Sequence, residues 1–438
     1  MKLNTDDKNL AINGGKKIRI KPWLDNFLFG DEEKKAVSDV IDTGYLSKFE
    51  GNFHTDPPFS FKGGPYVQKL EELWCERYKS RYAVSINSAT SGLSAAIGAL
   101  RIGYGDEVIV SAGTMTACAM APLIYGAIPI FADVNKYTGN ITAQSFQNLI
   151  TSRTKAIIVV HTYGIPADMD EIVKIARNHK ISIIEDCAQA HGTLYKGKNI
   201  GTLGDIGVFS LNVNKQINCG EGGVCITNDE NLALRIQLIR NHGETSTAAA
   251  KVEDITNIAG YNYRLTEIQA AIAIEQLKKL DEYNRIRIEY AQYLNENLKR
   301  FEFLKIVDGC EGCSCKSKAD CYSTYYQWPI MFDLKKLGVD ILKIREILNA
   351  EGMYFIRAWK PLYRQPLYQQ KKLFKYNYPF DAEPNKSIKT NYHEGSCPNV
   401  EWIYDNVLLK EYLRYPTTWE DVKQVELAME KLDSAISK

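Results

Sequence analysis

The sequence is most informative at Phe209-Ser-Leu-Asn-Val-Asn-Lys215 and, shortly afterwards, at Gly220-Glu-Gly-Gly223. The apolar run Ile206–Ser210 predicts a buried strand, and polar residues begin where this strand ends. The glycines permit tight turns and let another group approach the backbone closely. A lysine in this position can be held against a bound cofactor, although most lysines at strand ends are simply solvated.

Short apolar runs alternate with amphipathic stretches on both sides of this segment, from about Arg81 to Asp229. The apolar runs are Ala83–Ile86, Glu107–Ser111, Ile128–Ala132, Ala156–Val160, Ile181–Glu185, Ile206–Ser210 and Gly223–Thr227. Between them, Ser91–Leu100 and Met169–His179 have helical spacing. This alternation predicts an α/β fold with a mostly parallel sheet flanked by helices. Ligands bind beyond the carboxyl ends of the strands in such sheets, so we expect the functional site there.

Two further groups of polar residues follow predicted strands. Asp186 comes after an apolar run, where it either caps the next helix or keeps the ring nitrogen of a pyridine cofactor protonated, which turns the ring into an electron sink. The stretch Asn87-Ser-Ala-Thr-Ser91 opens a predicted helix with small side chains, hydroxyls and backbone N–H groups. It either only caps that helix or binds a phosphate dianion.

The order of several motifs resembles the DegT/DnrJ/StrS family of sugar aminotransferases. The motifs are Asn87-Ser-Ala-Thr90, Gly105-Asp-Glu-Val-Ile109, Ile184-Glu-Asp-Cys-Ala-Gln-Ala-His-Gly192, Phe209-Ser with Lys215, Gly220-Glu-Gly-Gly223 and Gly260-Tyr-Asn-Tyr-Arg264. The resemblance runs from about Ile18 to Leu280, with a weaker tail. It implies a fold-type I transferase that depends on pyridoxal 5′-phosphate (PLP). The expected reaction moves an amino group from glutamate or glutamine to a keto sugar, expected to be nucleotide-linked, in amino-sugar biosynthesis.

The resemblance also implies roles for individual residues around the cofactor ring. Lys215 would form the Schiff base with PLP, and Asp186 would pair with the pyridinium nitrogen. Gln189 would lie near the 3-hydroxyl group of the ring. Lys215 and Asp186 are therefore the expected catalytic residues.

The phosphate site implied by the resemblance draws on two subunits. Ser210, Ala89 and Thr90 would bind the phosphate from within one chain. Asn262 would complete the phosphate site of the partner subunit, and Arg264 would face the carboxylate of the amino donor. A homodimer with shared active sites is therefore expected.

Two positions depart from the common pattern of the family. Ala89 stands where the family often has glycine, and Thr114-Met115 stands where an aromatic residue would stack on the ring. The polarizable sulfur of Met115 can pack against a ring face, so we expect it to contact the cofactor. His161, close to a strand end, is either a substrate contact or a hydrogen-bonded structural residue.

The chain of 438 residues is long enough for more than one domain. We expect an N-terminal segment over 1–25, a large PLP-binding α/β domain over 26–280 and a small α+β domain over 281–438. The last of these is predicted from two charged helical stretches, an apolar run and a closing helical stretch: Asp281–Arg300, Ile341–Glu351, Tyr325–Phe332 and Trp419–Ile436. The segment 359–397 has no regular periodicity, and we expect it to be irregular.

Composition excludes some classes of protein. The chain carries 54 basic and 53 acidic side chains, a formal charge of +1, so nothing indicates nucleic-acid binding. The first twenty residues lack the apolar core of a signal peptide and no later run reaches transmembrane length, so we expect a cytoplasmic protein without membrane contact.

We expect no metal ion in the active site. Cys118, Cys187, Cys219 and Cys225 are expected to be reduced and buried. A separate group, whose CxxCxC spacing could bind zinc or form disulfides, consists of Cys310, Cys313, Cys315 and Cys321.

Three alternative functions remain open beside the expected one. A dehydratase on the same scaffold typically has histidine in place of the lysine, so Lys215 argues against it. An aminotransferase could instead act on a free ketocyclitol, as the inosose aminotransferases do. A binding or sensor protein on the PLP fold would not need Lys215.

Overall fold

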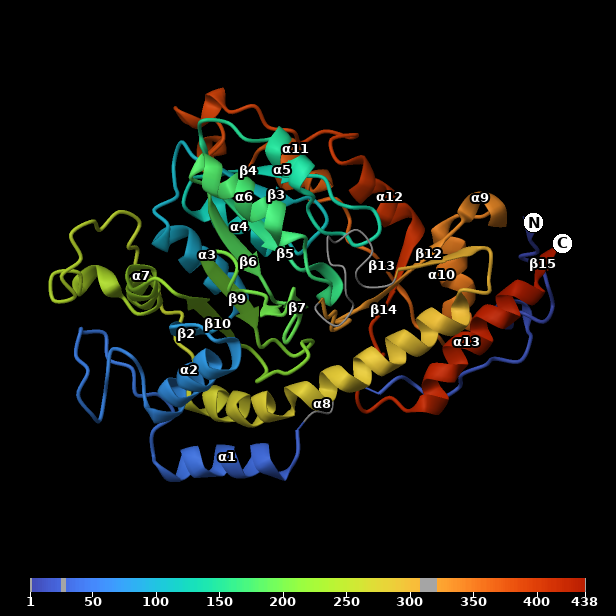
Figure 1. The fold of residues 1–438 in the computed structure, drawn as a ribbon, viewed down its shortest axis with the longest axis horizontal. Coiled ribbons are helices and arrows are strands. Elements are labelled where there is room, and N and C mark those ends of the chain that lie inside the picture. The colour runs from blue at the N-terminus through green and yellow to red at the C-terminus, as the bar shows by residue number, and fades with distance from the viewer. Residues whose placement is uncertain (1, 25–28, 308–320, 438) are drawn as a thin grey trace.

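The computed structural model describes residues 2–24, 29–307 and 321–437 (Figure 1). Its centre is a seven-stranded sheet in the order β2-β10-β9-β6-β5-β3-β4. The strands are β2 (Tyr82–Ile86), β3 (Glu107–Ser111), β4 (Ile128–Ala132), β5 (Thr154–Val160), β6 (Ser182–Asp186), β9 (Ile206–Ser210) and β10 (Gly223–Thr227). Each apolar run of the sequence forms one of these strands. The prediction of an α/β fold with a mostly parallel sheet is confirmed.

One strand of this sheet departs from the parallel arrangement. β10 runs antiparallel to both of its neighbours, β2 and β9. A parallel connection needs a crossover, usually a helix, whereas the connection over 211–222 contains no helix. The chain therefore turns back beside β9, and Lys215 lies in that turn.

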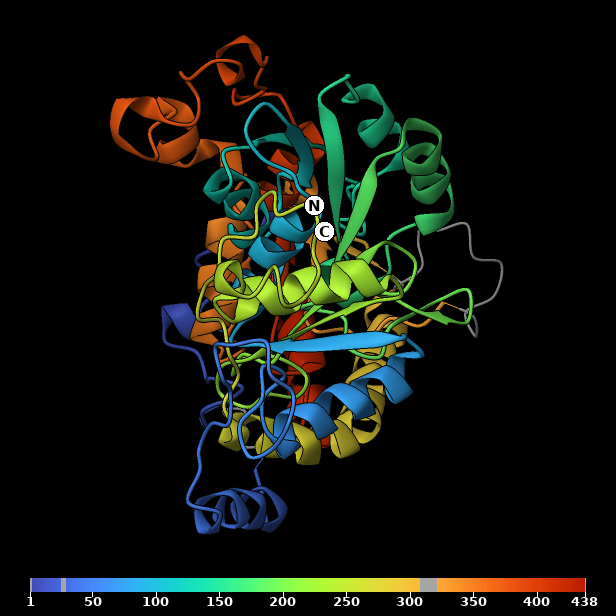
Figure 2. The ribbon, with the colours of Figure 1, turned by 90° about the vertical axis from the view of Figure 1, so that its left-hand side faces the viewer.

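Helices cover both faces of the sheet. In Figure 2, α2 and α8 lie on one side of β2 and α7 lies on the other. The helices of this part of the chain are α1 (Asp31–Asp42), α2 (Pro65–Tyr78), α3 (Ala89–Ala99), α4 (Ala117–Ile124), α5 (Ala143–Asn148), α6 (Met169–His179), α7 (Glu230–Arg240) and α8 (Glu267–Leu298). A short hairpin, β7 (Leu194–Tyr195) and β8 (Lys198–Asn199), lies beside them.

A second, antiparallel sheet has the order β11-β12-β14-β13. Its strands are β11 (Leu304–Ile306), β12 (Trp328–Phe332), β13 (Ile356–Arg357) and β14 (Val407–Lys410). The helices of this region are α9 (Leu334–Leu337), α10 (Ile341–Ala350), α11 (Pro366–Gln370), α12 (Pro398–Asn406) and α13 (Trp419–Ser434). β1 (Lys2–Leu3) pairs with β15 (Ile436–Ser437), so the two ends of the chain lie side by side (Figure 1).

Short 3₁₀ helices complete the secondary structure, at Ala11–Asn13, Thr162–Gly164, Gly243–Thr245, Leu362–Arg364, Lys375–Asn377 and Asn385–Ser387. Among the described residues, no helix combines the length and apolar character that crossing a bilayer requires.

The long helix α8 links two hydrophobic cores. Leu280 packs in the core around the large sheet, whereas Ile288 and the rest of the helix pack in the core of the small sheet. The N-terminal residues Leu3 and Leu10 join the smaller core. Side chains of the segment 358–403 belong to the larger core, so this segment packs back on the large sheet.

A buried ion pair between Arg240 and Glu71 contacts β2, the first strand in the order of the large sheet. The Arg240 guanidinium donates to Glu71 Oε1 at 2.7 Å and to the carbonyl oxygen of Ser85 at 3.0 Å. Its side chain is fully buried and that of Glu71 is 12% exposed. Glu71 also accepts the N–H of Ser85 at 2.8 Å, so the pair fixes β2 to α2 and α7.

Replacing Arg240 by methionine is expected to lower the free energy of unfolding by about 3 kcal/mol, because it leaves the Glu71 carboxylate without its cationic partner. Chemical denaturation measures this change. Arg285→Met is the control, since Arg285 pairs with Glu282 and Glu289 on the exposed face of α8 and such pairs contribute at most about 1 kcal/mol. Equal losses in the two variants would contradict the prediction.

Candidate active site

A cavity of about 370 Å³ lies beyond the carboxyl ends of β2, β6 and β9. It brings together most of the residues singled out in the sequence: Ala89, Thr90, Met115, Asp186, Gln189, Ser210 and Lys215. Ser88, Leu93, Ala117, Ala188, Asn212, Asn214, Glu221, Tyr326 and Trp359 complete the lining. Its size is within the range of small-molecule sites.

Lys215 is held by the turn between β9 and β10. Its backbone N–H donates to the carbonyl oxygen of Asn212 at 2.9 Å, and the Asn212 amide donates to Glu221 at 2.9 Å. The Lys215 Nζ lies 4.6 Å from the centroid of the Tyr326 ring. A cation above an aromatic face is attracted to it, so Tyr326 holds the amine in the cavity.

Asp186 is the last residue of β6 and is only 5% exposed. Its Oδ1 accepts the backbone N–H of Ala188 at 3.0 Å, and its Oδ2 accepts the thiol of Cys118 at 3.0 Å. Gln189 Oε1 accepts the N–H of Tyr163 at 2.9 Å, which orients the side-chain amide so that its NH₂ group remains as a donor. A carboxylate and an amide donor thus line the same cavity as Lys215.

The start of α3 forms another part of the cavity. Ser88 is the N-cap, and its Oγ accepts the N–H of Ser91 at 3.1 Å. The first N–H groups of a helix have no partner within it and lie at the positive end of its dipole, which favours an anion. A Cβ atom on Gly223 would lie 2.9 Å from the Ala89 nitrogen and 2.8 Å from the Phe209 carbonyl oxygen. Glycine at this position therefore lets β10 lie close to the start of the helix.

The structure does not bring Asn262 or Arg264 into this cavity. Arg264 Nε donates to Asn262 Oδ1 at 2.7 Å, and burial lowers the pKa of Arg264. The segment lies beside the start of α3, since the N–H of Asn87 donates to the carbonyl oxygen of Tyr263 at 2.8 Å. Both residues thus belong to a segment next to the helix start, but neither lines the cavity of its own chain.

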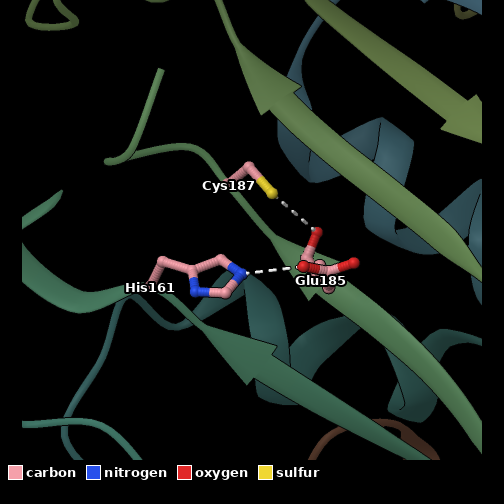
Figure 3. A group of neighbouring side chains, drawn as sticks. All are labelled: His161, Glu185 and Cys187. Carbon is pink, nitrogen blue, oxygen red and sulfur yellow. Dashed lines mark hydrogen bonds and ion pairs between the residues drawn. The ribbon is translucent and has the colours of Figure 1, made fainter. Parts of the chain in front are cut away.

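His161 is fully buried and does not line the cavity. Its Nδ1 accepts the N–H of Ala167 at 3.1 Å. The proton is therefore on Nε2, which donates to Glu185 Oε2 at 3.0 Å (Figure 3). Both ring nitrogens are engaged in hydrogen bonds within the protein.

His161, Glu185 and Cys187 could together be considered as metal ligands, because their ligand atoms lie within 4.8 Å of one another (Figure 3). The Glu185 carboxylate also accepts N–H groups of the loop 201–204 at 2.6 to 2.8 Å. Burial raises the pKa of the Cys187 thiol well above its usual value, so the thiol stays protonated. These hydrogen bonds indicate that the cluster stabilises the loop 201–204 and is not a metal site.

Cys118, Cys187, Cys219 and Cys225 are free and buried, as predicted. Cys310, Cys313 and Cys315 lie outside the described residues, and Cys321 is buried.

Two lining residues, Tyr326 and Trp359, were missed by the sequence analysis. They precede β12 and follow β13, so they come from the small sheet. Tyr326 falls in the apolar run that predicted β12, but nothing in that run indicates a neighbour more than 100 residues earlier. Only the packing of the two sheets brings them to Lys215.

Comparison with known proteins identifies this arrangement. The model of the DegT/DnrJ/EryC1/StrS aminotransferase family matches residues 58–425. An uncharacterized protein of Methanocaldococcus jannaschii is 33% identical over 412 residues, which cover 92% of this chain and 96% of that protein.

Two solved structures are similar over most of their length. The aminotransferase from Psychrobacter cryohalolentis is 28% identical with a TM-score of 0.79, covering 95% of this chain and 100% of that one. DesV of S. venezuelae, solved in complex with a ketimine intermediate, is 26% identical with a TM-score of 0.75, covering 93% and 95%. The chain therefore belongs to the DegT/DnrJ/EryC1/StrS aminotransferase family and is a PLP-dependent aminotransferase with the fold-type I architecture.

Proposed function

We propose that the enzyme transfers the amino group of glutamate or glutamine to a keto sugar, in its nucleotide-linked form, during amino-sugar biosynthesis. The observation that carries this proposal is the meeting of Lys215, Asp186 and the start of α3 in one cavity. PLP requires an amine for its carbonyl group, a carboxylate for its ring nitrogen and an anion-binding helix start for its phosphate. The sugar is supported by the resemblance to the sugar aminotransferases.

The residues present fit the cofactor. We propose that Ala89, Thr90 and Ser210 hold the phosphate at the start of α3, whose backbone a Cβ atom on Gly223 would displace because it would lie 2.9 Å from the Ala89 nitrogen. Gln189 offers an amide donor for the 3-hydroxyl group. The Met115 thioether, whose sulfur accepts the N–H of Ala117 at 3.0 Å, is proposed to pack on the ring face.

Bound PLP supplies an electron sink for the negative charge left on a substrate carbon that loses a proton. Lys215 is proposed to bind the cofactor through Nζ and, once the amino donor has displaced it, to carry a proton from and to the substrate carbon. The Tyr326 ring, 4.6 Å from Nζ, borders the space in which the freed amine moves. Asp186 keeps the ring nitrogen protonated. The two half-reactions predict ping-pong kinetics.

We propose further that a homodimer completes the site. Asn262 and Arg264 lie outside the cavity of their own chain, joined by their 2.7 Å hydrogen bond. Asn262 would reach the phosphate in the partner subunit, and Arg264 would face the carboxylate of the amino donor. His161 is not proposed as a substrate contact, because Glu185 and Ala167 occupy both of its ring nitrogens.

The test is the purified enzyme with a matrix of donors and acceptors. The bound cofactor should absorb in the visible range, and glutamate or glutamine should abolish that band. Nucleotide-linked keto sugars, free keto sugars and ketocyclitols are then offered to the aminated enzyme. Turnover of a ketocyclitol alone would assign the alternative acceptor, and loss of a sugar hydroxyl without amination would assign a dehydratase. A protein that binds no PLP would contradict the whole proposal.

Gly223→Ala is expected to weaken PLP binding by about tenfold or more, since overpacking at this contact costs about 1–3 kcal/mol. Titration of the apoprotein with PLP measures the dissociation constant. Gly51→Ala is the control, because a Cβ atom there meets no atom within 4 Å. Unchanged affinity in the Gly223 variant would show that the phosphate binds elsewhere.

A further inference from the structure

Asp186 has an unusual partner on the side of α4. Cys118, in the first turn of that helix, is fully buried, and its Sγ lies 3.0 Å from Asp186 Oδ2. The other oxygen of the carboxylate accepts the N–H of Ala188 at 3.0 Å. The orientation of the carboxylate is therefore set by one backbone amide and one thiol.

The thiol in this pair is the hydrogen-bond donor. Burial raises the pKa of Cys118 well above its usual value, and the charge of Asp186 raises it further. The sulfur therefore keeps its proton and donates it to the carboxylate. Among the described residues, no ion pair involves Asp186, so a neutral and weak donor is what stabilises its charge on this side.

We propose that Cys118 is a positioning residue that fixes the rotamer of Asp186 and sets how strongly this carboxylate holds the proton on the PLP ring nitrogen. The inference rests on the proposed role of Asp186 opposite that nitrogen. A carboxylate that accepts a hydrogen bond is less basic than one that does not. A thiol is a weaker donor than a hydroxyl, so it orients the carboxylate while leaving most of its charge for the ring nitrogen.

Three variants separate this role from simple packing. Cys118→Ala removes the donor, and Cys118→Ser replaces it by a stronger one of similar size. Cys225→Ala is the matched control, because Cys225 is also a buried free thiol, lies on β10 of the large sheet and makes no hydrogen bond with Asp186.

The readouts are the dissociation constant of PLP and the pH midpoint of the visible band of the bound cofactor. In Cys118→Ala we expect PLP binding to weaken by about threefold to tenfold, because the Asp186 carboxylate loses the hydrogen bond that fixes its rotamer opposite the ring nitrogen. A carboxylate whose charge is no longer shared with the thiol should interact more strongly with the ring nitrogen, which should raise the pH midpoint by about half a unit. Cys118→Ser should restore the affinity and bring the midpoint back to that of the unaltered enzyme or below it.

Two results would overturn the inference. Either Cys118→Ala leaves both readouts unchanged, or Cys225→Ala moves the midpoint as much as Cys118→Ala does. Failure of the proposed function is recognised separately, since the unaltered enzyme would then show no visible band, or Asp186→Asn would leave its pH midpoint unchanged.

Discussion

Lys215→Ala should abolish the PLP adduct that borohydride reduces and should lower kcat by about 10³-fold or more. Lys215 is the sole lysine among the described residues that line the cavity, so no neighbouring amine can take its place. The expected loss combines two roles proposed for the same Nζ atom, covalent binding of the cofactor and proton transfer at the substrate carbon. Proton transfer by a positioned side chain alone contributes about 10²–10⁴-fold.

The measurement pairs borohydride reduction and mass spectrometry with single-turnover kinetics. Noncovalent PLP should still bind, because the start of α3 and Ser210 are untouched. Lys174→Ala is the control, since Lys174 is an exposed residue of α6 whose contact is an ion pair with Glu171. An adduct that persists in Lys215→Ala would place the covalent bond on another lysine, and a kcat within tenfold of the unaltered enzyme would contradict the proton-transfer role.

The sequence could predict the large sheet because each of its strands is buried on both faces and therefore appears as a continuous apolar run. For the same reason, Asp186, Ser210 and Lys215 could be placed at one edge of the sheet, since they stand at or shortly after the ends of runs that parallel strands bring together, whereas their expected roles came from the family resemblance. His161 also follows a strand, β5, yet it is buried against Glu185. Position at a strand end does not reveal which neighbour a side chain contacts.

Contacts between distant segments could not be predicted. Tyr326 and Trp359 reach the cavity through the packing of the small sheet, and Cys118 reaches Asp186, at the end of β6, from helix α4. The helix α8 shows a related difficulty, because its charged and apolar residues continue without interruption from one hydrophobic core to the other. The local periodicity of a helix indicates which of its residues are buried. It does not indicate which of the two sheets those residues pack against.

Asp186→Asn is expected to separate cofactor binding from catalysis. Asparagine has nearly the same size and can still accept the N–H of Ala188 through its amide oxygen, so the fold should be kept. Lys215 should still bind PLP, and the protein should remain coloured. The neutral amide cannot keep the ring nitrogen protonated, so the ring loses most of its power as an electron sink. We expect the rate of the half-reaction with the amino donor to fall by about 10³-fold.

Stopped-flow absorbance after mixing with glutamate or glutamine follows that half-reaction directly. Asp229→Asn is the matched control, because Asp229 caps α7 by accepting the N–H of Leu232 and asparagine caps helices equally well. A half-reaction slowed less than tenfold in Asp186→Asn would show that the ring nitrogen does not depend on this carboxylate. Since Cys118 is proposed to act only through Asp186, replacing Cys118 by alanine in the Asp186→Asn background should then cause no further shift of the pH midpoint. This second result completes a double-mutant cycle. It would show that the thiol acts through the carboxylate, because independent effects of the two substitutions would add.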